Sequence, residues 1–213
     1  MKLINMTVEN FIKEVDSASP APGGGSVSAL ASSLGVSLAR MVGHLTFGKK
    51  KYNEFSDEVK EKFTQSFDKL DTVNQKLVDL IDKDTDNFNL VMAAFKMPKE
   101  TDEEKAVRSA AIQKATILAT ETPLKMAELS LEALEVLDDF VEYGNKNAIT
   151  DVGVAVLLAT AGAKGSIYNV KINLPGIENE MLVKEIKSQC EHVLAKVVKL
   201  SSELEAKIEA KLV

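Results

Sequence analysis

The chain has 213 residues, of which 45% are hydrophobic and 27% are charged. These are ordinary values for a globular domain, and they exclude an intrinsically disordered chain. The formal net charge of -6 excludes the broad basic surface that non-specific nucleic-acid binding requires. The single cysteine, Cys190, cannot form an internal disulfide, and with only two histidines the chain has no Cys/His zinc pattern.

No segment of the sequence has the pattern of a secretory signal or a membrane span. The first residues, Met1 to Asn5, contain no long apolar run. The longest nearly uncharged stretch, Ala148 to Ala163, includes Asp151 and is shorter than the roughly 20 apolar residues that cross a bilayer. We therefore expect a soluble, cytoplasmic protein that binds neither a membrane nor nucleic acid.

Apolar residues recur at helical spacing along almost the whole chain, which predicts an all-α fold. Thr7 is expected to cap a short helix that ends near Val15. The next helix is expected from Ser26 to about His44. It carries small residues at every fourth position, Ala31, Gly35, Ala39 and Gly43. Glycine inside a helix is unfavourable by about 1 kcal/mol relative to alanine, so this stripe predicts a compensating close helix contact.

The middle of the chain is expected to form four further helices. The first two run from Tyr52 to about Lys83 and from Phe88 to Phe95, with Asp82, Asp84 and Asp86 at the junction between them. A capping-box pattern at Thr101 and Glu104 predicts a helix that runs towards Glu121. Pro123 is expected to open the next one.

The last third of the sequence predicts two long helices. The run from Ala148 to Ala163 is apolar on nearly every side, which places it at the centre of a bundle. A short extended piece is possible from Asn169 to Leu174. Apolar residues between Ile186 and Ile208 then predict a C-terminal helix with coiled-coil-like packing. Together these elements predict one helical bundle domain that spans residues 1–213.

The only Pro/Gly-rich segment ends in Gly23, Gly24, Gly25 and Ser26, directly before a predicted helix. Exposed backbone N–H groups and the helix dipole would form a cradle for an anion or a carbonyl there. The alternative is a tight entry turn into a closely packed helix. The segment is not a P-loop, because no Lys-Ser/Thr pair follows the last glycine.

Asp151 is the most informative acidic residue of the sequence. It precedes the apolar run and shares a helix face with Asn147 if that turn is formed. A carboxylate near a dry core either finds partners or has a raised pKa, which suits proton transfer near neutral pH. The alternative is that Asp151 only caps its helix. The aspartates around Asp84 lack the glycine and glutamate of an EF-hand, so no metal site is expected.

Other polar residues have both a functional and a structural interpretation. Lys49, Lys50 and Lys51 would attract a polyanionic substrate tail, or they form a solvated junction. The amides of Asn169 and Asn173 would orient a polar heterocycle, or they satisfy turn backbones.

Five ordered motifs together resemble the formiminotransferase–cyclodeaminase C-terminal domain family. They are Ala21–Ser26, Lys49–Tyr52, Asp84–Phe88, Gly144–Asn147 with Asp151, and Asn169–Asn173. The resemblance extends from about Phe11 to Pro175, and the chain resembles the stand-alone bacterial form. It implies an all-helical homodimer or dimer of dimers that acts on a reduced folate, with no metal and no redox cofactor.

The resemblance implies two possible reactions. A cyclodeaminase, which is an ammonia lyase of histidine breakdown, converts formimidoyl-tetrahydrofolate to methenyl-tetrahydrofolate. The alternative is methenyl-tetrahydrofolate cyclohydrolase, a cyclic amidine hydrolase of one-carbon metabolism. A third possibility is a non-enzymatic helical oligomerisation module, built by the small-residue stripe and the C-terminal apolar seam.

The resemblance also implies roles for the candidate residues. Asp151, with Asp84, would move protons. Asn147, Asn169 and Asn173 would orient the pterin. The backbone of Gly23, Gly24, Gly25 and Ser26 would donate hydrogen bonds, and Lys49 and Lys50 would attract the glutamate carboxylates of the folate.

Overall fold

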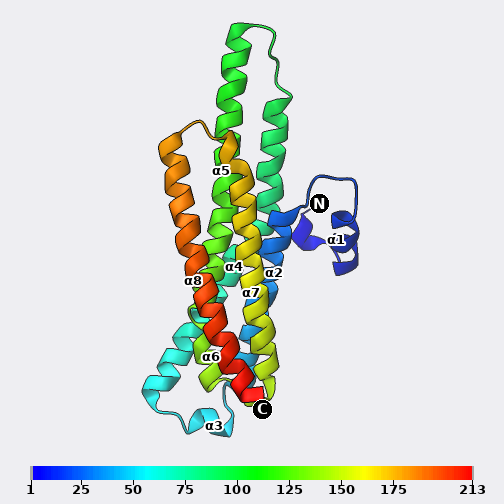
Figure 1. Cartoon of the computed structure of the whole chain (residues 1–213). Helices are drawn as coiled ribbons and strands as arrows, with labels where there is room; N and C mark the ends of the chain where they lie inside the picture. The colour runs from blue at the N-terminus through cyan, green and yellow to red at the C-terminus, as the bar shows by residue number, and fades with distance from the viewer. Residues whose placement is uncertain (1, 213) are drawn as a thin grey trace.

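The computed structural model describes residues 2–212, and every regular element within that range is a helix (Figure 1). The α-helices are α1 (Val8–Val15), α2 (Gly24–Thr46), α3 (Lys50–Asn53), α4 (Asp57–Phe95), α5 (Asp102–Leu134), α6 (Leu137–Tyr143), α7 (Ile149–Asn173) and α8 (Glu180–Leu212). Three short 3-10 helices join them: η1 (Leu3–Asn5), η2 (Lys146–Ala148) and η3 (Leu174–Gly176). The predicted all-α fold is confirmed.

Helices α2 and α7 lie side by side and antiparallel in the middle of the bundle. Gly24 at the start of α2 lies beside Asn169 near the end of α7, whereas Gly35 lies beside Ala155. A Cβ added to Gly35 would be 2.8 Å from the Ala155 carbonyl oxygen. The predicted close contact of the small-residue stripe is therefore confirmed, and it is made within one chain.

Helices α4 and α5 form a long hairpin that rises beyond the rest of the bundle, and α8 covers the other side of α5 and α7 (Figure 1). The apolar stripe of α8 is buried in the main core, at Ile186, Cys190, Val193, Val197, Leu204 and Ile208. The apolar seam of the C-terminal helix therefore packs against other helices of the same chain. The α1 helix stands apart as an arm beside the start of α2.

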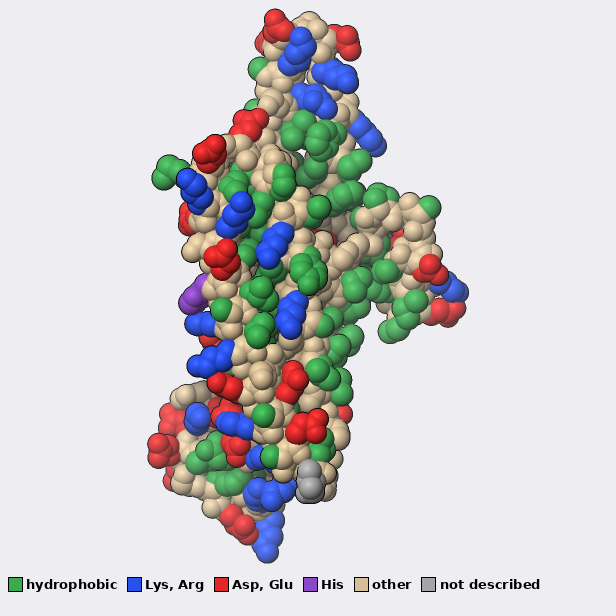
Figure 2. Space-filling model, in the orientation of Figure 1, with side chains coloured by type: hydrophobic (Ala, Val, Ile, Leu, Met, Phe, Trp, Pro, Cys, Tyr) green, Lys and Arg blue, Asp and Glu red, His purple; other side chains and the backbone are tan. Residues whose placement is uncertain are grey.

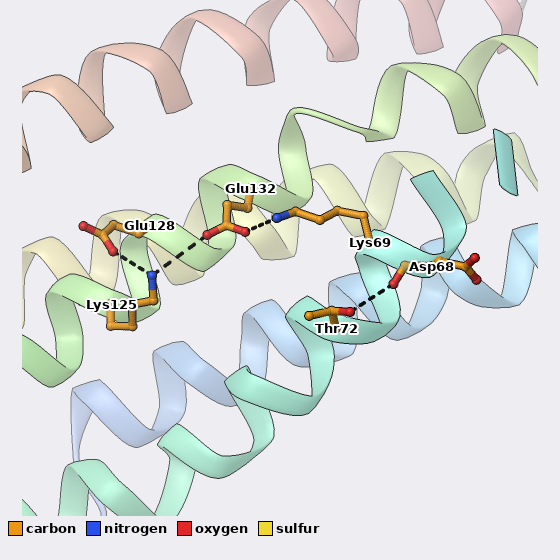
Figure 3. A network of polar contacts seen from close by, with 6 residues as sticks. All are labelled: Asp68, Lys69, Thr72, Lys125, Glu128 and Glu132. Atoms are coloured by element: carbon orange, nitrogen blue, oxygen red, sulfur yellow. Dashed lines mark hydrogen bonds and ion pairs between the residues drawn. The ribbon is translucent and has the colours of Figure 1, made fainter. Parts of the chain in front are cut away.

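One ion pair joins α4 to α5 on the outside of the hairpin, and Lys125 extends it within α5 (Figure 3). Lys69 bonds Glu132, and Lys125 lies 3.0 Å from Glu128 and 4.0 Å from Glu132. Exposed pairs of this kind contribute about 0–1 kcal/mol each. The two helices are therefore held together mainly by the apolar residues between them.

The two local capping patterns are confirmed. Thr7 Oγ1 accepts a hydrogen bond from Asn10 N at 3.2 Å, and Thr101 with Glu104 forms the complete capping box. Helix α2 begins at Gly24, two residues earlier than the sequence predicts. The segment from Asn169 to Leu174 is helical, so the extended piece considered there is wrong.

The expected helix junction near Asp84 is wrong, because α4 continues without a break from Asp57 to Phe95. The polar side chains there bind remote groups and do not cap a helix end. Asp82 Oδ1 accepts from Leu3 N at 2.6 Å, and Asn87 Nδ2 donates to Thr122 Oγ1 at 2.7 Å. Because these side chains bond to groups far away in the sequence, they do not compete for the backbone hydrogen bonds of α4, and the helix continues.

The expected helix start at Pro123 is also wrong, because α5 runs through this proline. A proline has no N–H, so the carbonyl four residues earlier, that of Ala119, loses its helical partner. Asn173 Nδ2 at the end of α7 donates to that carbonyl oxygen at 2.9 Å. The contact keeps α5 continuous and fixes the end of α7 against it.

This contact predicts a coupling between two substitutions. Asn173→Ala is expected to lower the free energy of unfolding by about 1–3 kcal/mol, since it leaves a partly buried carbonyl without a donor. In a Pro123→Ala background the penalty is expected to shrink, because an alanine at this position would supply the missing N–H. Urea denaturation of the four proteins of this cycle measures the effect, with the exposed Asn89→Ala as control. Equal penalties in both backgrounds would contradict it.

Candidate active site

The start of α2 is fixed on the carboxylate of Asp84, which projects from the middle of α4. Ser26 N donates to Asp84 Oδ2 at 2.9 Å, and Ser26 Oγ lies 3.3 Å from the same oxygen. The hydroxyl also donates to the Ile81 carbonyl oxygen at 2.7 Å. A carboxylate at a helix N-terminus is favourable because it accepts from free N–H groups and faces the positive end of the dipole.

The glycines before Ser26 allow side chains from two other helices to approach the backbone. A Cβ on Gly25 would overlap the Asp84 carboxylate, and a Cβ on Gly24 would lie 3.1 Å from Asn169 Nδ2. Gly23 caps the helix in an extended conformation, with φ of -119°. The glycines are therefore needed for space, and the loop, Asp84 and Asn169 form one cluster.

Burial raises the pKa of the Asp84 carboxyl above its ordinary value of 3.8, and the hydrogen bonds from Ser26 only partly oppose this. Burial has this effect because it disfavours the charged form of a carboxyl. A carboxyl with a raised pKa is protonated over a wider pH range, so it can both donate and accept a proton closer to neutrality.

The raised pKa of Asp84 predicts a pH dependence of stability. Because the folded pKa lies above the unfolded one, the contribution of Asp84 is fully present below about pH 4 and is lost as the pH rises through the folded pKa. The free energy of unfolding of the wild type, minus that of Asp84→Asn, is thus expected to fall over this range. Urea denaturation of both proteins at several pH values tests it, and a constant difference would contradict it.

Two further polar residues near Asp84, Thr85 and Asn87, lie within the Asp84–Phe88 motif, but the sequence analysis assigns them no role of their own. Thr85 Oγ1 lies 3.2 Å from Ser26 Oγ. Asn87 is buried, and besides Thr122 it donates to the Leu118 carbonyl oxygen at 3.1 Å. Its Oδ1 atom is buried without a hydrogen-bond partner within residues 2–212. Thr85 and Asn87 follow Asp84 by one and three positions, and within a continuous helix this spacing would have indicated that they lie near it.

An apolar strip continues from Asp84 along α4, beyond the point where α2 begins. Phe88, Val91 and Phe95 follow Asp84 at steps of four, three and four, so they lie on one face of the helix. Phe88 and Val91 are half-buried, and Phe95 is 50% exposed. The site therefore combines a carboxyl, an amide and backbone N–H groups with an apolar wall suited to a flat heterocycle.

Four of the candidate residues, Asp151, Asn147, Lys49 and Lys50, lie at the other end of the bundle. Asp151 is in the first turn of α7, whereas Asn169 is near its end. The 18 residue steps from Asp151 to Asn169 span about 27 Å at the rise of an α-helix. Asn147 in η2 shares the end of Asp151, and so do Lys49 and Lys50, which are exposed next to the C-terminal end of α2. One chain therefore does not bring Asp151 to Asp84.

Asp151 and Asn147 lie near the start of α7, away from Asp84. Asp151 is half-buried and forms no hydrogen bond or ion pair with the residues that the structure describes. Asn147 N donates to Asn145 Oδ1 at 3.1 Å, which shapes the turn before α7. Asn173, at the Asp84 end, uses its amide nitrogen on the Ala119 carbonyl. Nowhere in residues 2–212 do three His, Cys, Asp or Glu side chains gather so as to hold a metal ion.

The fold and the site define an all-helical protein with a half-buried carboxyl held at a glycine-rich helix start. Residues 7–192 match the model of the formiminotransferase-cyclodeaminase family, so the chain belongs to this family. A curated relative, methenyltetrahydrofolate cyclohydrolase of Methylorubrum extorquens, is 36% identical over 97% of this chain and 98% of its own. Formimidoyltransferase-cyclodeaminase of Rattus norvegicus is 31% identical over 90% of this chain, which spans 35% of that longer protein.

A solved structure has the same fold over nearly the full length. Formiminotetrahydrofolate cyclodeaminase of Thermotoga maritima aligns with a TM-score of 0.85 and 26% identity, and 98% of each chain is covered. The relatives are enzymes whose names refer to the one-carbon chemistry of reduced folates.

Proposed function

We propose that this protein is a formimidoyl-tetrahydrofolate cyclodeaminase that uses Asp84 as a proton donor and acceptor. The half-buried carboxyl with a raised pKa, fixed at the α2 start opposite Asn169, is the observation that carries the proposal. The cyclodeaminase and cyclohydrolase relatives support a reduced folate as the substrate.

The chemistry requires proton transfers to and from the nitrogens that are bonded to a single carbon. The second folate nitrogen attacks the formimidoyl carbon and loses its proton, which gives a tetrahedral intermediate. The amino group of the intermediate must then be protonated before it leaves as ammonia. A positioned carboxyl with a raised pKa is suited to that protonation, and such a group contributes about 10²–10⁴-fold in rate.

The other groups of the site bind and orient the substrate in this proposal. Asn169 Nδ2 already donates to the Gly165 carbonyl oxygen at 2.9 Å, so its second N–H and its Oδ1 are offered to the pterin ring, and the backbone at Gly24 and Gly25 offers donors. The apolar strip from Phe88 to Phe95 covers the flat part of the folate. Asp151 and Asn147 take part through the homodimer or dimer of dimers that we also propose as the working unit. There, Lys49 and Lys50 attract the glutamate carboxylates.

A second candidate reaction is the hydrolysis of methenyl-tetrahydrofolate. The relative that matches over its full length, at 36% identity, bears the name of this cyclohydrolase. Water would then attack the same carbon, and the carboxylate form of Asp84 would accept its proton. Both reactions pass through a tetrahedral carbon between the same two nitrogens, so one site serves either.

Assaying the purified protein with each substrate tests the proposal. Ammonia release from formimidoyl-tetrahydrofolate is expected, and loss of methenyl-tetrahydrofolate absorbance without it would favour the second candidate. If neither substrate is converted and calorimetry shows no binding of a reduced folate, the enzymatic proposal fails. The third possibility, an oligomerisation module, would then stand.

A further inference from the structure

Arg108, near the tip of the α4–α5 hairpin, has no carboxylate partner among residues 2–212. It is one of two arginines in the chain. The other, Arg40, is paired with Asp71, whose Oδ1 lies 3.0 Å from Arg40 Nη2. An arginine is charged at every physiological pH and binds carboxylates with good geometry. The charge of Arg108 is therefore open to an anionic ligand.

The last turn of α4 holds the guanidinium of Arg108 in place. Its Nε and Nη2 donate to the Phe95 carbonyl oxygen at 3.3 and 3.1 Å, and its Cζ lies 5.7 Å from the centre of the Phe95 ring. The side chain is half-buried. Both N–H groups of Nη1 and the second one of Nη2 remain, and they form the edge that binds a carboxylate with two parallel hydrogen bonds.

Arg108 and Asp84 lie at opposite ends of the apolar strip on α4. Asp84 precedes the strip, and Phe95, its last member, contacts Arg108. Arg108 also lies on the face of α5 that packs against α4. Thr122 and Leu118 on that face bond to Asn87, and steps of three and four residues lead from Leu118 to Arg108.

The surface of the hairpin has the same order of apolar and basic groups. Hydrophobic side chains cover the part of the hairpin that rises above the bundle, and basic side chains lie beyond them, towards the tip (Figure 2). A ligand with a flat apolar part and an anionic end fits this order.

The length of the strip matches the part of a folate between its reacting carbon and its glutamate. The 11 residue steps from Asp84 to Phe95 span about 17 Å at the rise of an α-helix. The p-aminobenzoyl amide carries the α-carboxylate about 12 Å from the reacting carbon at ordinary bond lengths. A contact of about 3 Å at each end brings the total to about 18 Å. A folate whose reacting carbon lies beside Asp84 therefore reaches Arg108 with this carboxylate.

The other cations are less well placed to hold this carboxylate. Lys105 on α5 lies 2.9 Å from Asp102 and is already paired. Lys99 at the tip is exposed. Lys49 and Lys50 lie beyond the far end of α2, so within one chain they do not reach the strip. Arg108 is the cation that contacts the strip and is held there by hydrogen bonds.

We propose that Arg108 binds the α-carboxylate of the folate glutamate and thereby sets the position of the substrate along the strip. The inference rests on the proposed function, because it requires a reduced folate with its reacting carbon at Asp84. This carboxylate lies far from the reacting carbon, so it is bound equally in the substrate and in the transition state. Arg108 thus lowers KM and leaves kcat nearly unchanged.

A comparison of two enzymes with two substrates tests this role. The substrates are the reduced folate that the wild type converts, formimidoyl or methenyl, and the corresponding pteroate, which lacks the glutamate. The wild type is expected to have a KM about 10–100-fold lower for the folate, the usual effect of a hydrogen-bonded charge pair. With Arg108→Gln the KM for the folate is expected to rise by about this factor, and the KM for the pteroate is expected to stay the same. An equal preference for the folate in both enzymes would overturn the proposal.

Two further variants separate binding from structure. Lys114→Gln removes a charge from an exposed position of α5 and is expected to keep the full preference for the folate. Arg108→Lys keeps the charge but loses the paired N–H groups, so an intermediate preference is expected. If Arg108 only caps the end of α4, Arg108→Gln changes the KM of both substrates equally, which would also overturn the proposal.

These measurements distinguish the failure of this inference from the failure of the proposed function. If the wild type converts neither folate, both fail. If the wild type is active and Arg108→Gln keeps the preference for the glutamate, the role of Arg108 fails alone. Loss of the preference in Lys50→Gln but not in Arg108→Gln would assign the carboxylate to the lysines and overturn the inference.

Discussion

Replacing Asp84 by asparagine is expected to lower kcat by about 10²–10⁴-fold, the usual contribution of a positioned acid or base. Asparagine has nearly the same shape, and its Oδ1 can still accept from Ser26 N, which donates at 2.9 Å in the wild type. The fold and KM are therefore expected to change little. Steady-state kinetics with formimidoyl- and methenyl-tetrahydrofolate measure kcat and KM. A far-ultraviolet circular dichroism spectrum checks that the fold is unchanged.

Asp86→Asn is the matched control for this experiment. Asp86 lies two residues further along α4 and is exposed, so its carboxylate points away from Ser26. Activity of this variant is expected to be close to that of the wild type. Turnover by Asp84→Asn within a few-fold of the wild type would remove Asp84 from its role, and a comparable loss in both variants would point to a general charge effect.

Gly162→Ala is expected to lower the free energy of unfolding by about 2–4 kcal/mol, because it forces α2 and α7 apart. Its Cβ would overlap Ser32 Oγ and lie 2.7 Å from the Ser28 carbonyl oxygen. Ser32 Oγ is buried and bonded to Ser130 Oγ at 2.6 Å, so it cannot move without losing that bond. Urea denaturation followed by circular dichroism measures the loss.

Gly153→Ala provides the opposite control in the same helix. The nearest atom to a Cβ there is Ile208 Cγ2, at 3.5 Å, which is ordinary contact. Alanine is favoured over glycine inside a helix by up to about 1 kcal/mol, so this variant is expected to be slightly more stable than the wild type. Similar destabilisation by both substitutions would show that the close approach at Gly162 is not the cause.

The sequence predicts a helix start correctly where the residues that cap it are close neighbours in the chain. The cap at Thr7 and the capping box at Thr101 depend on residues three positions away, and both are present. The breaks expected near Asp84 and at Pro123 are absent because remote groups satisfy the polar atoms there. No spacing rule shows that Asn173 would serve the Ala119 carbonyl, 54 residues away.

The candidate site was predictable in part. The glycine segment, Asp84 and Asn169 were each singled out, and the structure brings them together. The place of Asp151 was not predictable, because spacing does not show at which end of a bundle two helices meet. Asn87 lies in the quoted Asp84–Phe88 motif, but its bond to Thr122 is not predicted, because the sequence favours helix breaks near both residues.

The hydrogen bond between Ser26 and Asp84 couples the protonation state of Asp84 to the local stability of the first turn of α2. The folded site favours the neutral carboxyl, so ionisation of Asp84 favours opening of the first turn of α2, which returns the carboxyl to water. The amide hydrogen of Ser26 should therefore exchange with solvent faster at high pH than the intrinsic rate of exchange accounts for. Exchange at the first turn of α2 thus reports the protonation state of Asp84, the carboxyl that is proposed to transfer the proton.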